Sequence, residues 1–261
     1  MVQSFGRWTM LAAAVCLLSL PASAQDMMRH VDLSSPMFSS AGMTRAEVEA
    51  SLKAAPSGAD LSGKSLNGLD LSGLDFTSVN FRAARMNKTN FSGARLDGAV
   101  LDQVWAMAAD FSGASLRKAN LFGSQMQEAK CDGADFSGAR VAADLSRASL
   151  RNAKFVGADL AADMRNQSMG LIRAVLKSAD LAGADFEGAN LALTDLQFAK
   201  FLGANLKGAS LVEAEAGGAD FRGAILDHTN FTGTDVASAR IGAAQEKAFS
   251  GAKNLERAFR E

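Results

Sequence analysis

The sequence predicts an all-β solenoid, in which the chain coils through four short sides per turn. Three observations predict it: a five-residue apolar period, an abundance of small residues and a shortage of large aromatic ones. The 261-residue chain contains 24 Gly, 3 Pro and no Tyr. A repeat that stacks on its own copies can bury small and medium side chains without a thick layered core, so it suits this composition.

The five-residue period runs from Ala59 to Ala243 and places a large apolar residue at the centre of each unit. Of 37 consecutive units, 28 have Leu or Phe at this central position. The residue two before it is mostly Ala, the residue one before it is often Asp or Asn, and the residue two after it is often Gly. Neither a helix nor a strand turns every fifth residue to one face. A square coil with one unit per side does, with Gly at the corner.

The units resemble a known family. Residues 109–113 and 134–138 both read Ala-Asp-Phe-Ser-Gly, and 204–208 read Ala-Asn-Leu-Lys-Gly. This pattern resembles the pentapeptide-repeat family, and the match covers about seven-tenths of the chain. The resemblance implies a right-handed quadrilateral β-helix. With four units per coil we expect about nine coils, a rod roughly 43 Å long at ~4.8 Å per layer.

The N-terminus has the three parts of an export signal. Arg7 precedes an apolar run over 9–20, and Ala22-Ser23-Ala24 provides small residues for cleavage. The sequence therefore predicts a signal peptide over 1–24, cleavage after Ala24 and a periplasmic or secreted protein without stable membrane insertion. An uncleaved N-terminal anchor is the alternative.

Both ends of the solenoid need caps, because an open coil exposes apolar core and unpaired backbone. In the N-terminal segment 25–58, Thr44 and Glu47 match a capping box, which predicts a capping helix over 45–55. The repeats occupy 59–243. We expect residues 244–261 to form an amphipathic α-helix that acts as a cap or a dimer contact through Phe249, Leu255 and Phe259.

The five-residue period shifts twice. The step from Val141 to Leu145 is one residue short, and the step from Leu160 to Leu171 is one residue more than two units. We expect a pinched corner near Ala142 and a small bulge over 163–168. Met164 is a candidate for the inward place in that bulge.

No catalytic residue, cofactor, metal site or small-molecule substrate is expected. The outward Asp residues stand at the consensus position, where short polar side chains bond to nearby backbone. The two histidines, His30 and His228, lie far apart in the sequence, and Cys131 takes a central, buried position.

Soft thioethers in an exported protein can bind Cu(I), so copper binding by the N-terminal segment is an alternative function. Its ligands would be Met27, Met28, His30, Met37 and Met43.

A contiguous apolar strip suggests a surface for a protein partner or for self-association. Because one coil has twenty residues, residues twenty positions apart should lie above one another. This places Ile172, Ala192 and Val212 in one outward column, where other coils have Ser72, Ser92, Ser112, Asp132 and Thr232. Leu193 and Phe198 lie at or near its edge, and Val175 lies on the next face. Trp105 either faces outward or folds in to fill the space that Ala106 leaves.

These observations favour a non-catalytic exported scaffold. The best-known branch of the family mimics DNA and protects topoisomerases such as gyrase, a role that requires a strongly negative surface and a cytoplasmic location. Within 59–243 there are 21 acidic and 19 basic residues. This near-neutral charge and the export signal disfavour the DNA mimic, and the same charge gives no basis for nucleic-acid binding.

Overall fold

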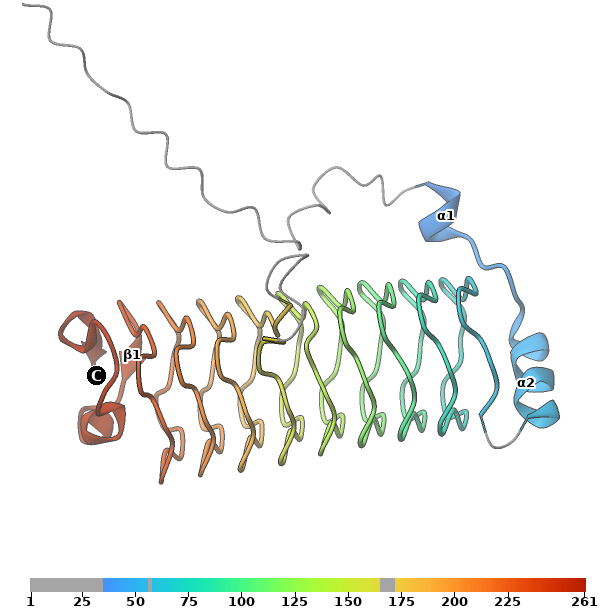
Figure 1. Cartoon of the computed structure of the whole chain (residues 1–261). Coiled ribbons are helices and arrows are strands. Elements are labelled where there is room, and N and C mark those ends of the chain that lie inside the picture. Colours follow the sequence, from blue (N-terminus) through green and yellow to red (C-terminus); the bar gives the residue numbers. More distant parts are fainter. Residues whose placement is uncertain (1–34, 56–57, 165–171) are drawn as a thin grey trace, which may run out of the picture.

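The chain forms an elongated rod of stacked coils. The computed structural model describes residues 35–261 apart from 56–57 and 165–171, so the predicted signal peptide lies outside the described residues. Helix α2 (Arg45–Ala54) lies at one end of the rod and the C-terminal segment at the other (Figure 1). The short helix α1 (Pro36–Ser39) lies beside the early coils.

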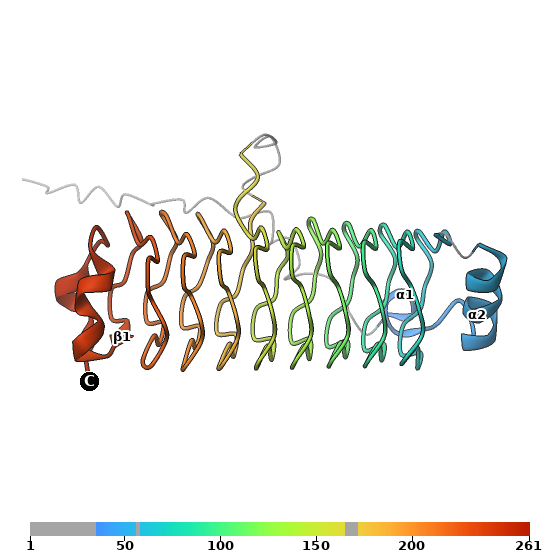
Figure 2. The same ribbon diagram turned by 90° about the horizontal axis from the view of Figure 1, so that it is seen from below.

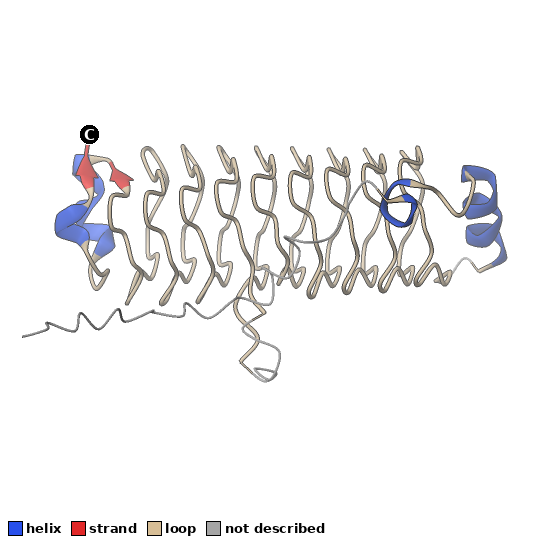
Figure 3. Ribbon diagram, turned by 90° about the horizontal axis from the view of Figure 1, so that it is seen from above, coloured by secondary structure: helices blue, strands red, loops and turns tan. Residues whose placement is uncertain are grey.

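Neighbouring coils are joined by parallel bridges between single outward residues. Asp60 pairs with Asn80 and Asn80 pairs with Val100, and the same twenty-residue spacing recurs on the other sides. Because each side contributes one bridging residue, the body of the rod is drawn as loops, with strands only at the C-terminal end (Figure 3). We number the sides 1 to 4, starting from the units centred on Leu61, Leu66, Leu71 and Phe76.

Each unit folds in the same way. In the first, Ala59 and Leu61 are buried, Asp60 bridges to the next coil, and Ser62 and Gly63 form the corner. The Lys64 N–H donates to the Leu61 carbonyl at 3.2 Å, and Gly63 has φ +66°. This is the geometry of a type II turn, whose third residue favours Gly. Leu193 and Phe198 adopt the same positive φ, at +61° and +59°.

The core consists of columns of identical side chains. On side 4, the rings of Phe136, Phe155 and Phe186 stack with centroid distances of 4.8 and 4.7 Å, almost parallel. Phe91 and Phe111 stack on side 3 at 5.1 Å. The spacing between hydrogen-bonded strands is also ~4.8 Å, so flat rings in one column meet face to face without distorting the backbone.

The first shift of the period is a pinched corner, as predicted. Gln125 pairs with Asp144, one residue less than a full coil away. Ala142 and Ala143 are both buried. Two small side chains at the corner therefore take up the missing residue without opening the core.

The second shift is an insertion of eleven residues, so the prediction of a small bulge over 163–168 is wrong. Asp144 pairs with Val175, thirty-one residues on, instead of twenty. The Ala174 N–H donates to the Leu160 carbonyl at 3.2 Å, which is the bond that closes an ordinary corner over three residues. The chain leaves the rod at this corner (Figure 2). Met164 is 57% exposed and does not take an inward place.

The insertion also changes which residues share a column. One residue removed and eleven inserted leave an excess of ten, half of a twenty-residue coil. Residues that are a multiple of twenty positions apart, but lie on either side of both shifts, are therefore on opposite sides of the rod. The Ala162 N–H donates to the Ala192 carbonyl at 3.2 Å, so the side 1 column of Ala192 and Val212 continues to Ala161. The predicted column with Ile172 is wrong, because the Ile172 carbonyl accepts from the Asp163 N–H at the neck of the insertion.

The C-terminal segment differs from the continuous helix expected over 244–261. It forms the 3₁₀ helices η3 (Ala243–Phe249) and η4 (Leu255–Arg257) and the strand β2 (Phe259–Arg260). Strand β2 pairs in parallel with β1 (Arg240–Ile241). The open edge of the last coil presents unpaired backbone groups, and pairing them with a strand outweighs extending the helix.

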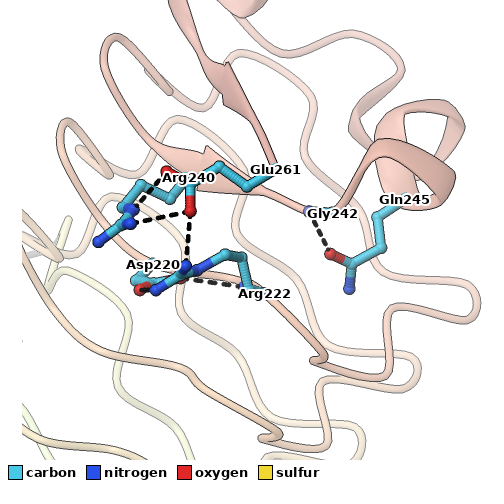
Figure 4. Close-up of polar contacts among 6 residues, drawn as sticks. All are labelled: Asp220, Arg222, Arg240, Gly242, Gln245 and Glu261. Atoms are coloured by element: carbon cyan, nitrogen blue, oxygen red, sulfur yellow. Dashed lines mark hydrogen bonds and ion pairs between the residues drawn. The ribbon is translucent and has the colours of Figure 1, made fainter.

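Two polar clusters secure this end (Figure 4). The Glu261 carboxylate accepts hydrogen bonds from Arg222 at 2.6 Å and from Arg240 at 2.8 Å, which ties β2 to two coils. Gln245 accepts from the Gly242 N–H at 2.8 Å and fixes the start of η3. Beneath them Phe249 is fully buried, with its ring centroid 4.3 Å from that of Phe231.

Replacing the middle ring of the side 4 stack tests this account of the core. Phe155→Ala removes a buried ring between two others, so we expect the free energy of unfolding to fall by about 3–5 kcal/mol in urea denaturation. The neighbouring Val156→Ala is the control, because Val156 is 40% exposed and should change stability by no more than about 0.5 kcal/mol. Equal effects of the two changes would contradict the stacked core.

Candidate interaction surface

The regularly placed acids on the rod are occupied in holding the backbone. The Asp60 carboxylate accepts from the Ser62 N–H at 3.0 Å, and hydrogen bonds from the Ser62 side chain and backbone lower the pKa of Asp60. The same bond to the N–H two residues on is made by other acids at the outward consensus position: Asp70, Asp75, Asp110, Asp135, Asp185 and Asp220. This confirms the prediction that they bond to nearby backbone.

Many other surface charges form ion pairs between neighbouring coils. Arg82 contacts Asp102 at 3.1 Å, and Arg147 contacts Glu128 at 2.8 Å. Each exposed pair contributes at most about 1 kcal/mol to stability, but together they intersperse the two signs of charge along the rod. Acidic and basic side chains are therefore interspersed over these parts of the described coils.

Side 2 of the C-terminal half carries three acids in one column, and Asp195 and Asp235 also accept from the N–H two residues on. Its outward residues on three successive coils are Asp195, Glu215 and Asp235. Burial raises the pKa of the Asp195 carboxyl, and the neighbouring Glu215 charge adds to the effect. Arg173 binds Glu215 at 2.8 Å and Gln197 donates to the same carboxylate at 3.1 Å. We call Asp195, Gln197, Glu215, Asp235 and Phe198 the acidic side.

A hollow of about 350 Å³ lies within the acidic side. The corner of its middle coil is Gly217-Gly218, and the ring of Phe198 lies over Gly218. A Cβ at Gly218 would come within 2.6 Å of that ring, so any other residue at this position would require the Phe198 ring to move. Phe198 is 57% exposed and forms one wall of the hollow.

Three of the predicted partner residues border this region. Phe198 belongs to the acidic side itself. Leu193 and Val212 lie at the corner between sides 1 and 2, and both are half-buried. The structure therefore brings Leu193, Phe198 and Val212 to the two edges of side 2, around the acidic column.

The other three predicted partner residues lie elsewhere. Ile172 is at the neck of the insertion, and Val175 is only 8% exposed, which leaves it little surface to offer a partner. Trp105 faces outward and is covered by α1, with its ring centroid 4.7 Å from that of Phe38. Of the two positions expected for Trp105, the indole therefore takes the outward one and does not fold into the core beside Ala106.

Exposed apolar side chains of the coil gather in its second half. Among the described residues of the coil, each large hydrophobic side chain that is exposed comes after position 155: Val156, Met164, Phe198, Leu202 and Ile225. Sequence reasoning missed Val156, Leu202 and Ile225. The sequence does contain a signal for these three residues, because each is a large apolar residue at a unit position that faces outward and is usually polar.

The described residues contain no group of three His, Cys, Asp or Glu side chains placed to hold a metal ion, and none of their helices is long and apolar enough to span a bilayer. Met43 is partly buried and packs against the core, whereas Met37 is exposed. Met27, Met28 and His30 lie outside the described residues.

Comparison with known proteins identifies the family. The family model for pentapeptide repeats matches the chain in eight copies, over residues 57–93, 75–105, 107–140, 142–162, 171–208 and 199–236. The chain therefore belongs to the pentapeptide-repeat family, whose members adopt a right-handed quadrilateral β-helix. No curated protein matches it in sequence.

Solved structures share this fold. Trypsin-treated QnrB1, a plasmid-mediated fluoroquinolone resistance protein, superimposes with a TM-score of 0.54 at 16% identity, covering 76% of this chain and 89% of QnrB1. HetL from the cyanobacterium Nostoc sp. strain PCC 7120, a pentapeptide-repeat protein involved in the regulation of heterocyst differentiation, is 26% identical with a TM-score of 0.30, over 74% of this chain and 97% of HetL. The likeness to QnrB1 concerns the fold alone.

The burial of Cys131 leads to a test of the packed core. Burial raises the pKa of its thiol far above the ordinary value, so the reactive thiolate is scarce at pH 8. We expect a thiol reagent to modify the native protein at least about 100-fold more slowly than the urea-unfolded protein. In Ser178→Cys, where the thiol is at an exposed corner, the native protein should react at once. Fast modification of native Cys131 would contradict the closed core.

Proposed function

We propose that this protein is a non-catalytic exported scaffold that binds a protein partner through the acidic side. The observation that carries the proposal is the exposed ring of Phe198 beside the column of Asp195, Glu215 and Asp235. Aromatic side chains next to a hollow are the usual anchors of protein interfaces. The regularly placed acids of the rod, with Asp195 and Asp235 among them, bond to the N–H two residues on, which supports a binding role over a catalytic one.

The chemistry of the acidic side suggests the kind of partner. Three carboxylates on successive coils attract Lys or Arg side chains, while Phe198, Leu193 and Val212 provide apolar contact at the edges. We therefore infer a partner segment that carries both basic and apolar residues. The charges would steer the encounter, and the apolar contacts would hold the complex together.

The proposal includes about nine coils closed at both ends, so that only the sides are offered to partners. At the N-terminal end, Val48 of α2 is buried in the core and Arg45 donates to the Asp70 carbonyl at 2.9 Å. At the other end, Phe249 is buried, Leu255 is partly buried and Phe259 is exposed. Of the three residues expected to form a cap or a dimer contact, Phe259 is therefore the one whose exposure supports self-association.

Export is part of the same proposal. The pattern over 1–24 supports cleavage after Ala24 and a periplasmic or secreted location. Mass spectrometry of the protein purified from its cells tests this, with Gln25 expected as the first residue. An intact N-terminus together with a cytoplasmic location would contradict export.

A DNA-mimicking topoisomerase protector is the second candidate, because the chain shares its fold with QnrB1. The near balance of acids and bases and their pairing between coils weigh against it. An effect of the purified protein on gyrase supercoiling, combined with cytoplasmic retention, would favour this candidate over the scaffold.

Variants of the acidic side test the scaffold. The tagged protein is used to capture partners from periplasmic extract, and the affinity of the captured partner is then measured. We expect Phe198→Ser and Glu215→Gln each to weaken it at least about tenfold, since anchor residues commonly contribute more than 1.4 kcal/mol to binding. Val156→Ser is the matched control, because it removes an exposed apolar side chain from side 4. Equal affinities for all variants would contradict the acidic side as the binding surface.

A further inference from the structure

Helix α1 and the residue after it form a strap that lies on side 2, beside the early coils (Figure 1). None of the α1 residues is buried, and Met37 is 61% exposed. A helix of four residues has little stability of its own in water, so it depends on what attaches it to the coils. We call residues 36–40 the strap.

Three polar side chains of the rod hold the strap by its backbone. Asn67 and Asn87 take the same unit position on successive coils, and both are buried. The Asn67 Nδ2 atom donates to the Ser40 carbonyl at 3.2 Å, and the Ser65 hydroxyl donates to the same carbonyl at 2.6 Å. The Asn87 Nδ2 atom donates to the Phe38 carbonyl at 3.2 Å. All of these acceptors are main-chain atoms, so these bonds do not depend on the side chains of the strap.

The rod itself fixes the direction of the two amides. The Asn67 Oδ1 atom accepts from the Asn87 N–H at 2.9 Å, and the Asn87 Oδ1 atom accepts from the Met107 N–H at 3.0 Å. Because each amide oxygen is bonded within the rod, each Nδ2 atom is left to face outward. The rod therefore presents two fixed donors to the backbone of whichever segment lies over them.

One ring contact completes the attachment of the strap. The Phe38 ring centroid lies 4.7 Å from that of Trp105. Trp105 is the outward residue of its unit, where the neighbouring coils have Arg85 and Gln125. Tryptophan is one of the residues that most often anchor protein interfaces. We call Asn67, Asn87 and Trp105 the strap surface.

The strap leaves adjoining space unfilled. A groove of about 570 Å³ begins at Phe38, and Met107 and Ala108 are apolar residues of its lining. A segment that placed one ring on Trp105 and a second apolar side chain in this groove would bury more apolar area than the strap does. Burial of that extra area would favour the segment over the strap.

We propose that the strap surface binds a segment of a partner protein, and that the strap is the internal occupant which this segment displaces. The partner segment carries an aromatic side chain for Trp105 and an apolar side chain for the groove. Small residues follow its aromatic side chain, so that its carbonyls reach Asn67 and Asn87. The strap shows this chemistry, since Phe38 is followed by the small residues 39–42.

This inference does not rest on the proposed function. The acidic side begins only at Asp195, several coils further along side 2, and shares no residue with the strap surface. The strap surface would thus be a second binding surface that the chain itself keeps covered. Phe198→Ser, which tests the acidic side, should leave binding at the strap surface unchanged.

Binding of a peptide in solution tests the proposal. The probe is a synthetic peptide with the sequence of residues 35–42, and the protein is the full chain with Phe38→Ser, which removes the ring that holds the strap. We expect the peptide to bind this variant at least about tenfold more tightly than the unaltered chain, where the tethered strap competes at a high local concentration. Trp8→Phe in both proteins leaves Trp105 as the only tryptophan, so its fluorescence reports binding.

A matched pair of variants identifies the contact. In the Phe38→Ser chain, Asn87→Asp retains the acceptor for the Met107 N–H but loses the outward donor, so the peptide should bind at least about tenfold more weakly. Asn230→Asp is the control, because Asn230 accepts from the Thr232 N–H in a similar way but is exposed on side 1. Its affinity for the peptide should be unchanged.

Three results would each overturn the proposal. They are equal affinity of the peptide for the Phe38→Ser and unaltered chains, no binding to either chain, and equal effects of Asn87→Asp and Asn230→Asp.

Discussion

The bridge between outward residues of neighbouring coils is the interaction on which the rest of this structure depends. When Asp60 pairs with Asn80 and Asn80 with Val100, every residue lies above its counterpart in the coil before it. The separation is that of hydrogen-bonded strands, ~4.8 Å. The parallel stack of Phe136, Phe155 and Phe186 and the ion pairs between coils both follow from this vertical alignment.

The same alignment explains why the rod accepts large changes at its corners. A residue added within a side would turn the following side chains from the core to solvent. At a corner, by contrast, eleven residues can leave the coil as long as Leu160 and Ala174 still close the turn between them. The insertion then rotates the sequence by half a coil, so residues that twenty-residue counting assigns to opposite sides, such as Ala161 and Ala192, share one.

Because residues stack in columns, the character of each side depends on a few positions repeated along the rod. Side 2 shows this most clearly. Near α1 it carries Trp105 beneath Phe38, and toward the C-terminus it carries Asp195, Glu215 and Asp235. One backbone geometry thus presents an internal contact and an acidic surface on the same side.

The sequence by itself determined the repeat, the buried Ala and Leu/Phe positions, the backbone role of acids such as Asp60, and the pinched corner at Ala142. All of these repeat within five residues or depend on neighbours in the chain. Only the tertiary structure decided the length of the insertion. An insertion of one residue and an insertion of eleven shift the five-residue repeat by the same amount, so the repeat pattern cannot distinguish them. It also decided the C-terminal end, where the helical spacing of Phe249 and Leu255 gave way to pairing of β2 with β1. An open edge of the coil offers hydrogen bonds that local sequence cannot reveal.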